Sequence, residues 1–169
     1  MQPIFILIRG NSGSGKTTLS DKLQQHFGYE HCLLLHQDVI RRDILHTHDH
    51  VGTPAIQLIE QLVKFGSQHY QIIILEGILK KDVYGNMLDK LIRNFDKSAF
   101  AYYLDVPFSV TVRHNNLKAT PFTVNTLKKW WLTDDSLIST REYKLNNGNT
   151  SDFFKQIITD ITNSSIDMP

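Results

Sequence analysis

The sequence predicts an α/β fold built around a parallel sheet, and three observations support this. Short apolar runs alternate with longer segments whose apolar residues recur at helical spacing, which is typical of such folds. A glycine-rich stretch, residues 10–16, separates the first apolar run from the first helical segment. Two later apolar runs end close to an acidic residue, Asp38 and Glu76. At 169 residues the chain has the length of one domain, so we expect residues 1–169 to fold as a single unit.

Composition and charge exclude several classes of protein. Hydrophobic residues make up 41% and charged residues 21%, as in ordinary globular proteins. The single cysteine, Cys32, excludes an internal disulfide and a zinc site built mainly from thiolates. A net charge of +1 is far from that of proteins that clamp duplex DNA. The longest apolar runs, residues 4–8 and 72–75, are far shorter than the ~20 residues of a membrane span, and no signal peptide is evident. We therefore expect a soluble, cytoplasmic protein.

The first third of the chain begins with a strand and a helix. Residues 3–8 are an apolar run of the length of a buried strand. Residues 17–27 form a helix, because Leu19, Leu23 and Phe27 recur four apart on one face. A second strand at residues 32–35 follows.

Helices then alternate with two further strands. Residues 39–45 are helical, and the next helix begins at Thr53 as cap and Pro54 in the first turn. Its apolar positions keep helical spacing: Ile56, Ile59, Leu62 and Val63. The third strand, residues 71–75, is apolar on both faces, as a central parallel strand should be. A helix at 83–95 and a strand at 99–104, which stops before Pro107, complete this part.

The last third of the chain is predicted to be mostly helical. Two helical segments, 108–117 and 124–132, are followed by a possible fifth strand at 140–145. The asparagine-rich residues 146–149 form a loop. The last helix spans residues 151–161.

The glycine-rich stretch carries the most specific signal in the chain. Residues 10–17 match G-x-x-x-x-G-K-[ST] at every defined position, between a strand and a helix. Glycines let backbone N–H groups point at an anion, and the helix N-terminus adds its positive end. Lys16 would neutralise the β- and γ-phosphates and the Thr17 hydroxyl would bind Mg²⁺. The expected ATP-binding residues are Gly10, Asn11, Ser12, Gly13, Ser14, Gly15, Lys16, Thr17 and Thr18.

Two alternatives to a kinase fit the sequence less well. A glycine- and serine-rich turn that binds nothing would not be expected to match both the motif and its context. The chain also lacks the Asn-Lys-x-Asp motif with which GTPases resembling Ras read their base, and it is short for a transporter or AAA-type ATPase. A short chain with a complete phosphate loop therefore points to a small kinase.

Asp38 follows the second strand, at the edge of the sheet where ligands of such folds bind. A carboxylate there can accept a proton from an attacking hydroxyl. Arg41 lies one helical turn later and could hold an anionic part of the acceptor or the transferring phosphoryl group, with Arg42 beside it. The alternative is that Asp38 only caps the following helix and that the arginines are solvated.

Glu76 ends the third strand, in the position of a Walker-B-type carboxylate that reaches Mg²⁺ directly or through water. Gly77 would let the chain turn close to the phosphates. The alternative is an exposed glutamate at a strand end.

The basic helix after the fourth strand is a candidate lid. Arg113 and Lys118 could neutralise charge in the transition state, or could simply lie on a solvated face. Phe122 and the pair Trp130–Trp131 are expected to pack, with stacking on an aromatic acceptor as the alternative. The polar turn with His46, His48, Asp49 and His50 fits no standard metal site, although it could contact the acceptor.

These motifs together resemble the small P-loop kinases. The phosphate loop, Asp38-x-x-Arg41, Glu76 and Asp105-Val106-Pro107 before a basic helix look most like the phage-type polynucleotide kinase domain, and more loosely like chloramphenicol phosphotransferase and the zeta-toxin kinases. The chain also resembles uncharacterised bacterial proteins labelled kinase or uridine kinase, in its loop, in Leu-Glu-Gly-Ile-Leu and in the tryptophan pair. The resemblance covers residues 4 to 131.

The resemblance implies a parallel sheet of five strands in the order 2-3-1-4-5, helices on both faces and a helical lid at about residues 107–132. It implies Asp38 as general base and Arg41 as the acceptor-side arginine. Lys118 occupies the place of the family's lid arginine, which leaves Arg113 as the nearby arginine, and Glu76 stands where the polynucleotide kinases have aspartate. The loop at 146–149 lies where small kinases often contact adenine.

The sequence thus predicts an ATP- and Mg²⁺-dependent phosphotransferase that acts on a hydroxyl of a small, nucleoside- or sugar-like molecule. Lys16, Asp38, Arg41 and Arg113 are the expected catalytic residues, Lys118 a further nucleotide contact, and Arg42 and Glu76 further acceptor contacts. A 5′-hydroxyl polynucleotide kinase is the alternative enzyme. A nucleotide-binding regulator with slow or no turnover is the alternative of another class. Both monomer and homodimer stay open, and no membrane partner is expected.

Overall fold

The computed structural model describes residues 2–117, 119–137 and 142–164. Within these ranges, five strands form one parallel sheet in the order β2-β3-β1-β4-β5. This confirms both the predicted class and the strand order that the resemblance implied. The strands are β1 (Ile4–Gly10), β2 (Cys32–His36), β3 (Ile72–Gly77), β4 (Ala99–Leu104) and β5 (Glu142–Leu145).

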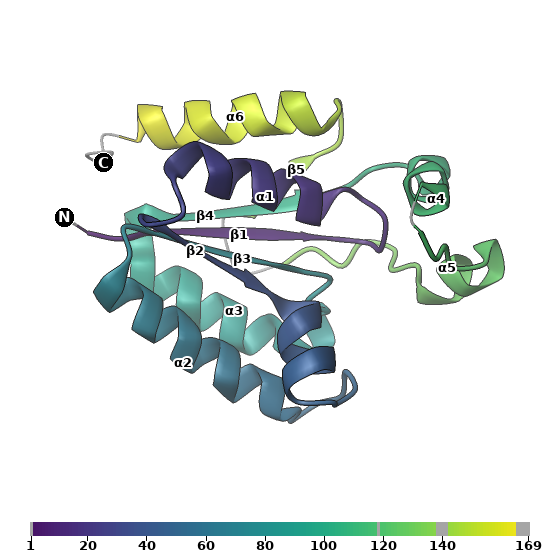
Figure 1. The fold of residues 1–169 in the computed structure, drawn as a ribbon, viewed down its shortest axis with the longest axis horizontal. Coiled ribbons are helices and arrows are strands. Elements are labelled where there is room, and N and C mark those ends of the chain that lie inside the picture. Colours follow the sequence, from purple (N-terminus) through teal and green to yellow (C-terminus); the bar gives the residue numbers. More distant parts are fainter. Residues whose placement is uncertain (1, 118, 138–141, 165–169) are drawn as a thin grey trace.

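Helices cover both faces of the sheet (Figure 1). Helices α1 (Lys16–Phe27) and α6 (Thr150–Asn163) lie on one face, and α2 (Pro54–His69) and α3 (Lys81–Phe95) on the other. Helices α4 (Phe108–Asn116) and α5 (Val124–Trp130) form a small lobe beyond the carboxyl ends of the strands. None of the helices in the described ranges is both long and apolar enough to cross a membrane.

The central strands β1 and β3 are buried along their whole length, which explains why their sequences are apolar without alternation. Successive side chains of β1 enter different cores. Phe5 and Leu7 pack with α2 and α3, while Ile6 and Ile8 pack with α1 and α6. The sheet is therefore fixed between two apolar layers, and its carboxyl edge is left to carry polar groups.

Most element boundaries agree with the sequence to within a few residues, and one element differs in kind. The predicted helix at 39–45 is a π-helical turn, η1 (Val39–Ile44), in which the Leu45 N–H donates to the Ile40 carbonyl at 3.1 Å. Wide turns of this kind are often found at functional sites. Residues 138–141, which include the start of the predicted fifth strand, lie outside the described residues, and Glu142–Leu145 pair with β4 as expected.

A buried arginine, Arg9, joins the end of β1 to distant parts of the chain. Its guanidinium is fully buried and donates to the Leu79 carbonyl at 2.8 and 3.1 Å, to Asp135 Oδ2 at 2.7 Å and to Glu142 Oε1 at 2.9 Å. It also lies 5.5 Å from the centre of the Tyr103 ring. Because Arg9 directly precedes Gly10, these contacts fix the point at which the glycine-rich loop begins.

Replacing Arg9 should destabilise the fold strongly. Arg9→Met keeps the side-chain volume but leaves the Asp135 and Glu142 carboxylates largely buried without their cation, a change that costs about 3–5 kcal/mol. The free energy of unfolding in urea measures the effect. The matched control is Lys144→Met, which removes the exposed ion pair with Asp134 and should leave stability unchanged. Equal unfolding midpoints for the two variants would contradict the assignment of Arg9 as an anchor.

Candidate active site

The glycine-rich loop connects β1 to α1 in a conformation that depends on glycine. Gly13 has a φ of 79° and Gly15, directly before α1, has a φ of 97°, values that side-chain-bearing residues rarely adopt. A Cβ atom at Gly13 would also stand 2.7 Å from the Thr111 carbonyl oxygen of α4. The loop therefore has its shape because the backbone must turn sharply and because α4 packs directly against it.

Lys16 folds back over this loop. Its side chain is nearly buried, and its Nζ donates to the Asn11 carbonyl at 2.8 Å and to Ser14 Oγ at 3.5 Å. The ammonium group thus lies over the concave side of the loop, where a phosphate-binding lysine is needed. Ser14 is buried as well, so this part of the loop is held by its own polar groups.

Thr17, Glu76 and His36 form a chain of polar contacts beside the loop. Thr17 Oγ1 donates to Glu76 Oε1 at 3.3 Å, and His36 Nδ1 lies 2.8 Å from the same oxygen. The parallel register explains this proximity, because Ile8 and His36 stand on either side of Glu76 in neighbouring strands. Glu76 is only 4% exposed, which excludes the alternative of an exposed strand-end glutamate.

The hydrogen bond with Glu76 raises the pKa of His36 above its ordinary value of 6.5, against the opposing effect of partial burial. The attraction of Glu76 and of Asp21, whose Oδ1 lies 3.7 Å from Nε2, acts in the same direction as the hydrogen bond. His36 is therefore biased toward its charged form, which pairs with the Glu76 carboxylate.

Asp38 and Arg41 are in contact, as their spacing predicts. Arg41 Nη2 donates to Asp38 Oδ1 at 3.0 Å, and Arg42 Nε lies 3.5 Å from the same atom. The Asp38 side chain is 49% exposed, whereas that of Arg41 is only 9% exposed. Asp38 forms no side-chain cap hydrogen bond at the start of η1, so a capping role does not account for it.

Two cavities lie on either side of the phosphate loop. We call the first, of about 300 Å³, the Asp38-side cavity; it is lined by Ser12, Gly13, Lys16, Thr17, His36, Asp38, Val39, Glu76, Gly77 and Ile78. The second, of about 420 Å³, is the Thr150-side cavity; it is lined by Gly13, Gly15, Lys16, Thr17, Thr18, His114, Leu117 and Thr150. Gly13, Lys16 and Thr17 line both cavities, so groups bound in the two cavities would meet at these residues.

The α4–α5 lobe contacts the loop at several points. His114 Nδ1 lies 2.9 Å from the Gly13 carbonyl oxygen. The Asn11 side chain accepts from the Leu132 N–H at 2.8 Å and donates to the Leu132 carbonyl at 2.9 Å. Arg113 is exposed on α4 and lines neither cavity, and Lys118 lies outside the described residues. The assignment of a lid cation thus stays a prediction.

Other candidate residues lie further from the loop. Phe122 packs edge-on against Trp130, with ring centres 5.0 Å apart, and Phe108 packs in the same way against Trp131 at 5.1 Å. These contacts favour the packing interpretation of the aromatic residues. Asn149 caps α6, and its neighbour Thr150 lines the Thr150-side cavity, so the adenine contact expected at 146–149 stays a prediction.

Of the polar turn at residues 46–50, Asp49 reaches the site. Its Oδ1 lies 3.3 Å from Arg41 Nε, a contact that the sequence did not reveal. Among the described residues, no group of three or more histidine, cysteine, aspartate or glutamate side chains could by itself hold a metal ion. Thr17 and Glu76 offer one hydroxyl and one carboxylate, the oxygen ligands with which Mg²⁺ is held when phosphates complete its coordination.

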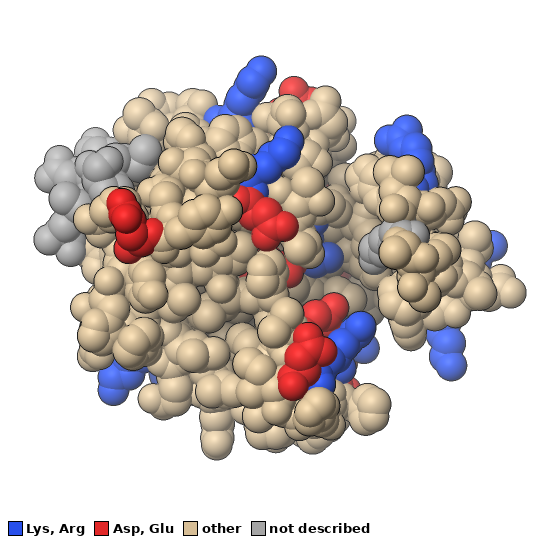
Figure 2. Space-filling view, viewed as in Figure 1, with Lys and Arg blue, Asp and Glu red and all other residues tan. Residues whose placement is uncertain are grey.

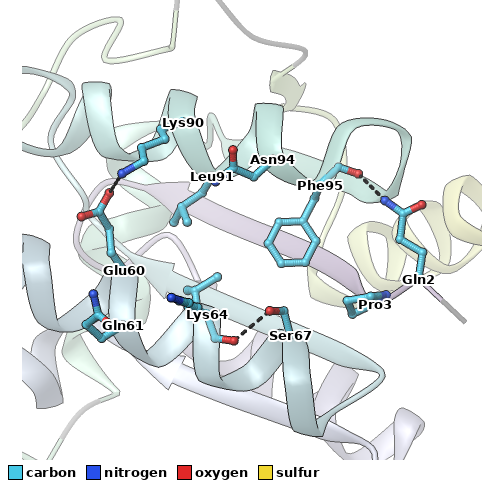
Figure 3. A pocket seen from close by; sticks show the side chains of 11 residues that line it. Gln2, Pro3, Glu60, Gln61, Lys64, Ser67, Lys90, Leu91, Asn94 and Phe95 are labelled. Carbon is cyan, nitrogen blue, oxygen red and sulfur yellow. Dashed lines mark hydrogen bonds and ion pairs between the residues drawn. The ribbon is translucent and has the colours of Figure 1, made fainter.

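A larger cavity of about 560 Å³ lies elsewhere, between α2 and α3 (Figure 3). Figure 3 shows Glu60 and Lys90 facing each other across it, 3.0 Å apart, with Gln2 and Pro3 at the other end. It opens near the start of β1, whereas the phosphate loop follows the end of that strand. None of the predicted site residues lines it.

Sequence reasoning missed several residues that shape the site. His36 could have been found, because a parallel register places it beside Glu76 once both strands are assigned. His114 gave no comparable signal, since its partner Gly13 is 101 residues away in sequence. Asn11 is among the predicted ATP-binding residues, but its hydrogen bonds to Leu132, 121 residues away, had no local signal.

A parallel sheet of order 2-3-1-4-5 with a phosphate loop after its first strand defines the P-loop kinase class of nucleotide-binding folds. Within this class, residues 1–98 match the Zeta toxin family model, which covers more than half of the chain, and the chain belongs to this family. No sequence among the curated proteins matches the chain.

Solved structures of kinases share this fold. A gluconokinase from Sinorhizobium meliloti 1021 is 13% identical, with a TM-score of 0.68 over 95% of this chain and 93% of that one. The APS kinase of Mycobacterium tuberculosis in complex with AMPPNP and APS is 12% identical, with a TM-score of 0.67 over 95% and 98%. A sugar kinase from Janibacter sp. HTCC2649 is 16% identical, with a TM-score of 0.64 over 95% of both.

The effect of Glu76 on His36 can be measured directly. We expect the pKa of His36 to lie above 6.5 and to fall in Glu76→Gln, because the negative charge is lost and the amide oxygen that replaces the carboxylate is a weaker acceptor, while partial burial remains. Stability from this pair is then fully present below the unfolded-state pKa and is lost as the pH rises through the raised value. NMR titration of the imidazole in both proteins tests this, and an unchanged pKa in Glu76→Gln would refute it.

A pair of glycine substitutions separates backbone strain from steric contact. Gly13 and Gly52 have almost the same φ, 79° and 80°, but a Cβ at Gly52 would meet nothing within 4 Å. Gly52→Ala should therefore cost about 1 kcal/mol of stability from strain alone. Gly13→Ala should cost more, and should also weaken nucleotide binding, because α4 must move away from the loop. Urea unfolding and nucleotide titration measure both effects, and similar results for the two variants would contradict the close approach of Thr111.

Proposed function

We propose that the protein is an ATP- and Mg²⁺-dependent phosphotransferase that moves the γ-phosphoryl group of ATP to a hydroxyl of a small, nucleoside- or sugar-like molecule. One observation carries the proposal. The phosphate loop lies between two cavities that share Lys16 and Thr17, and a half-exposed carboxylate, Asp38, lines one of them. Such an arrangement suits a donor on one side and an acceptor on the other.

The relatives support this assignment of a reaction class. The solved structures most like this chain include a gluconokinase, an APS kinase in complex with AMPPNP and APS, and a sugar kinase. Their names describe kinases of small molecules. We extend this to the present chain and propose that residues 1–169 act as one kinase domain.

In this proposal, ATP occupies the Thr150-side cavity with its phosphates on residues 10–18. Backbone N–H groups of the loop and the start of α1 bind the phosphate oxygens, and Lys16 neutralises the β- and γ-phosphates. Thr17 and Glu76 would hold Mg²⁺, which supplies positive charge to the phosphates when bound. His36 orients the Glu76 carboxylate through its 2.8 Å contact.

Asp38 would act as general base from the Asp38-side cavity. Its exposed carboxylate accepts the proton of the attacking hydroxyl, and the hydrogen bond from Arg41 holds it in position. Arg42 lies beside the same carboxylate and would contact the acceptor. We propose that the lobe supplies a cation from Arg113 or Lys118 that stabilises the transferring group once the lobe closes.

A 5′-hydroxyl kinase of nucleic acid is the second candidate. The exposed residues Lys128, Lys129 and Trp130 on α5 favour it, because basic and aromatic side chains together bind single strands. Activity on an oligonucleotide would fall steeply with salt, whereas activity on an uncharged small molecule would not.

Asp38→Asn separates catalysis from nucleotide binding. The variant should bind ATP about as well as the wild type, but transfer should fall about a hundredfold to ten-thousandfold, the usual contribution of a general base. Label transfer from γ-labelled ATP to a panel of nucleosides, sugars and 5′-hydroxyl oligonucleotides measures this, beside equilibrium ATP binding.

Lys16→Ala is the control for the loop. It should weaken ATP binding whichever function is correct, and should weaken transfer for either kind of acceptor. Undiminished transfer in Asp38→Asn would rule out Asp38 as the base. ATP binding by the wild type with no transfer to any acceptor would favour a nucleotide-binding regulator.

A further inference from the structure

A further cavity of about 470 Å³ lies between α1 and α6, which pack side by side on one face of the sheet (Figure 1). We call it the α1–α6 groove; it is lined by Lys22, Gln25, His26, Ser151, Phe154 and Lys155. Its volume is within the range of about 300–1,000 Å³ that is usual for sites of small molecules. None of these six residues lines either cavity at the phosphate loop, so the groove is a separate place on the molecule.

Each helix contributes a pair of polar side chains to the groove. Lys22 and His26 are one helical turn apart on α1, and Ser151 and Lys155 are one turn apart on α6. Both lysines are exposed, and within the described part of the chain neither side chain forms a hydrogen bond or an ion pair. The two walls therefore present two positive charges to one space.

The acidic residues next to these lysines are engaged elsewhere. Figure 2 shows acidic and basic side chains near one another over α1 and α6. Asp152 Oδ2 accepts a hydrogen bond from the Asn149 N–H at 2.9 Å as part of the cap of α6, and Asp21 Oδ1 lies 3.7 Å from His36 Nε2. Neither aspartate lines the groove. An anion bound there would relieve the repulsion between two ammonium groups that share one cavity.

The groove also has an aromatic wall. Phe154 is partly buried against the core on this face of the sheet, and His26 packs edge-on against it with ring centres 5.3 Å apart. The His26 ring also contacts Phe27, at 5.2 Å between ring centres. These contacts hold the rings in place, so they offer a fixed apolar surface to a flat ligand.

We propose that the α1–α6 groove is a binding site for a small phosphate monoester with an aromatic ring, such as a nucleoside monophosphate. The phosphate lies between Lys22 and Lys155, and the ring lies against Phe154 and His26. A phosphate monoester suits the groove better than a carboxylate, because it carries up to two negative charges and can pair with both lysines.

The groove continues the crevice that contains the Thr150-side cavity. Thr18, one turn before Lys22, and Thr150, directly before Ser151, line that cavity. A ligand in the groove would therefore lie next to a nucleotide on the phosphate loop without taking its place. The proposal adds a second ligand site and does not rest on the proposed function.

The test is an AMP titration of the full chain, with the phosphate loop already filled by a non-hydrolysable ATP analogue and Mg²⁺. The NMR signals of the His26 imidazole report binding, because His26 lines the groove and neither of the other two cavities. We expect a saturable shift with a dissociation constant of about 1 mM or below. Adenosine, which lacks the phosphate, and inorganic phosphate, which lacks the ring, should each bind at least about threefold more weakly.

A double variant, Lys22→Gln with Lys155→Gln, removes both charges and should weaken AMP binding about tenfold. The matched control is Lys64→Gln with Lys97→Gln, which removes two exposed lysines that do not line the groove and should bind AMP like the wild type. Equal binding of AMP by the two double variants would overturn the proposal.

Two further outcomes would also overturn it. One is the absence of a saturable shift up to about 10 mM AMP. The other is displacement of AMP by the ATP analogue, because the groove would then be part of the nucleotide site. Failure of the ATP analogue to bind would count against the proposed function instead, and the titration with AMP alone would still test the groove.

Discussion

The buried guanidinium of Arg9 determines where the phosphate loop can lie. It sits on the last residue of β1 before Gly10 and bonds to the segments that follow β3 and α5 and to β5. A fully buried charge is stable only when its hydrogen-bonding partners are held in place. The segments that carry Leu79, Asp135 and Glu142 must therefore pack together at the end of β1. The loop, the β3–α3 connection and the edge strand are thereby held as one unit around the carboxyl edge of the sheet.

On this fixed edge, each polar group of the site is held by a partner from a neighbouring strand or turn. Glu76 is shared between Thr17 and His36, and Arg41 is shared between Asp38 and Asp49. The two groups lie at the ends of the adjacent strands β2 and β3, so they face the same edge of the sheet. Fixed polar groups of this kind lower the reorganisation that a reaction requires.

Much of the fold and part of the site could be predicted from the sequence. The strands and helices follow from hydrophobic spacing, and the loop from a motif whose glycines and lysine have local causes. Asp38 and Glu76 follow from one rule, that ligands bind at the carboxyl ends of parallel strands. Arg9, by contrast, has partners 126 and 133 residues away, and the η1 turn depends on packing against α2, so neither has a local signature.

The α4–α5 lobe is attached to the phosphate loop at both of its ends. Gly13 meets Thr111 and His114 on the entering helix, and Asn11 holds Leu132 at the exit. The described part of the lobe is thus joined to the loop both at α4 and at Leu132. A ligand that changes the shape of the loop would therefore act on both ends of the lobe at once, in addition to any contact with His114 and Leu117, which line the Thr150-side cavity.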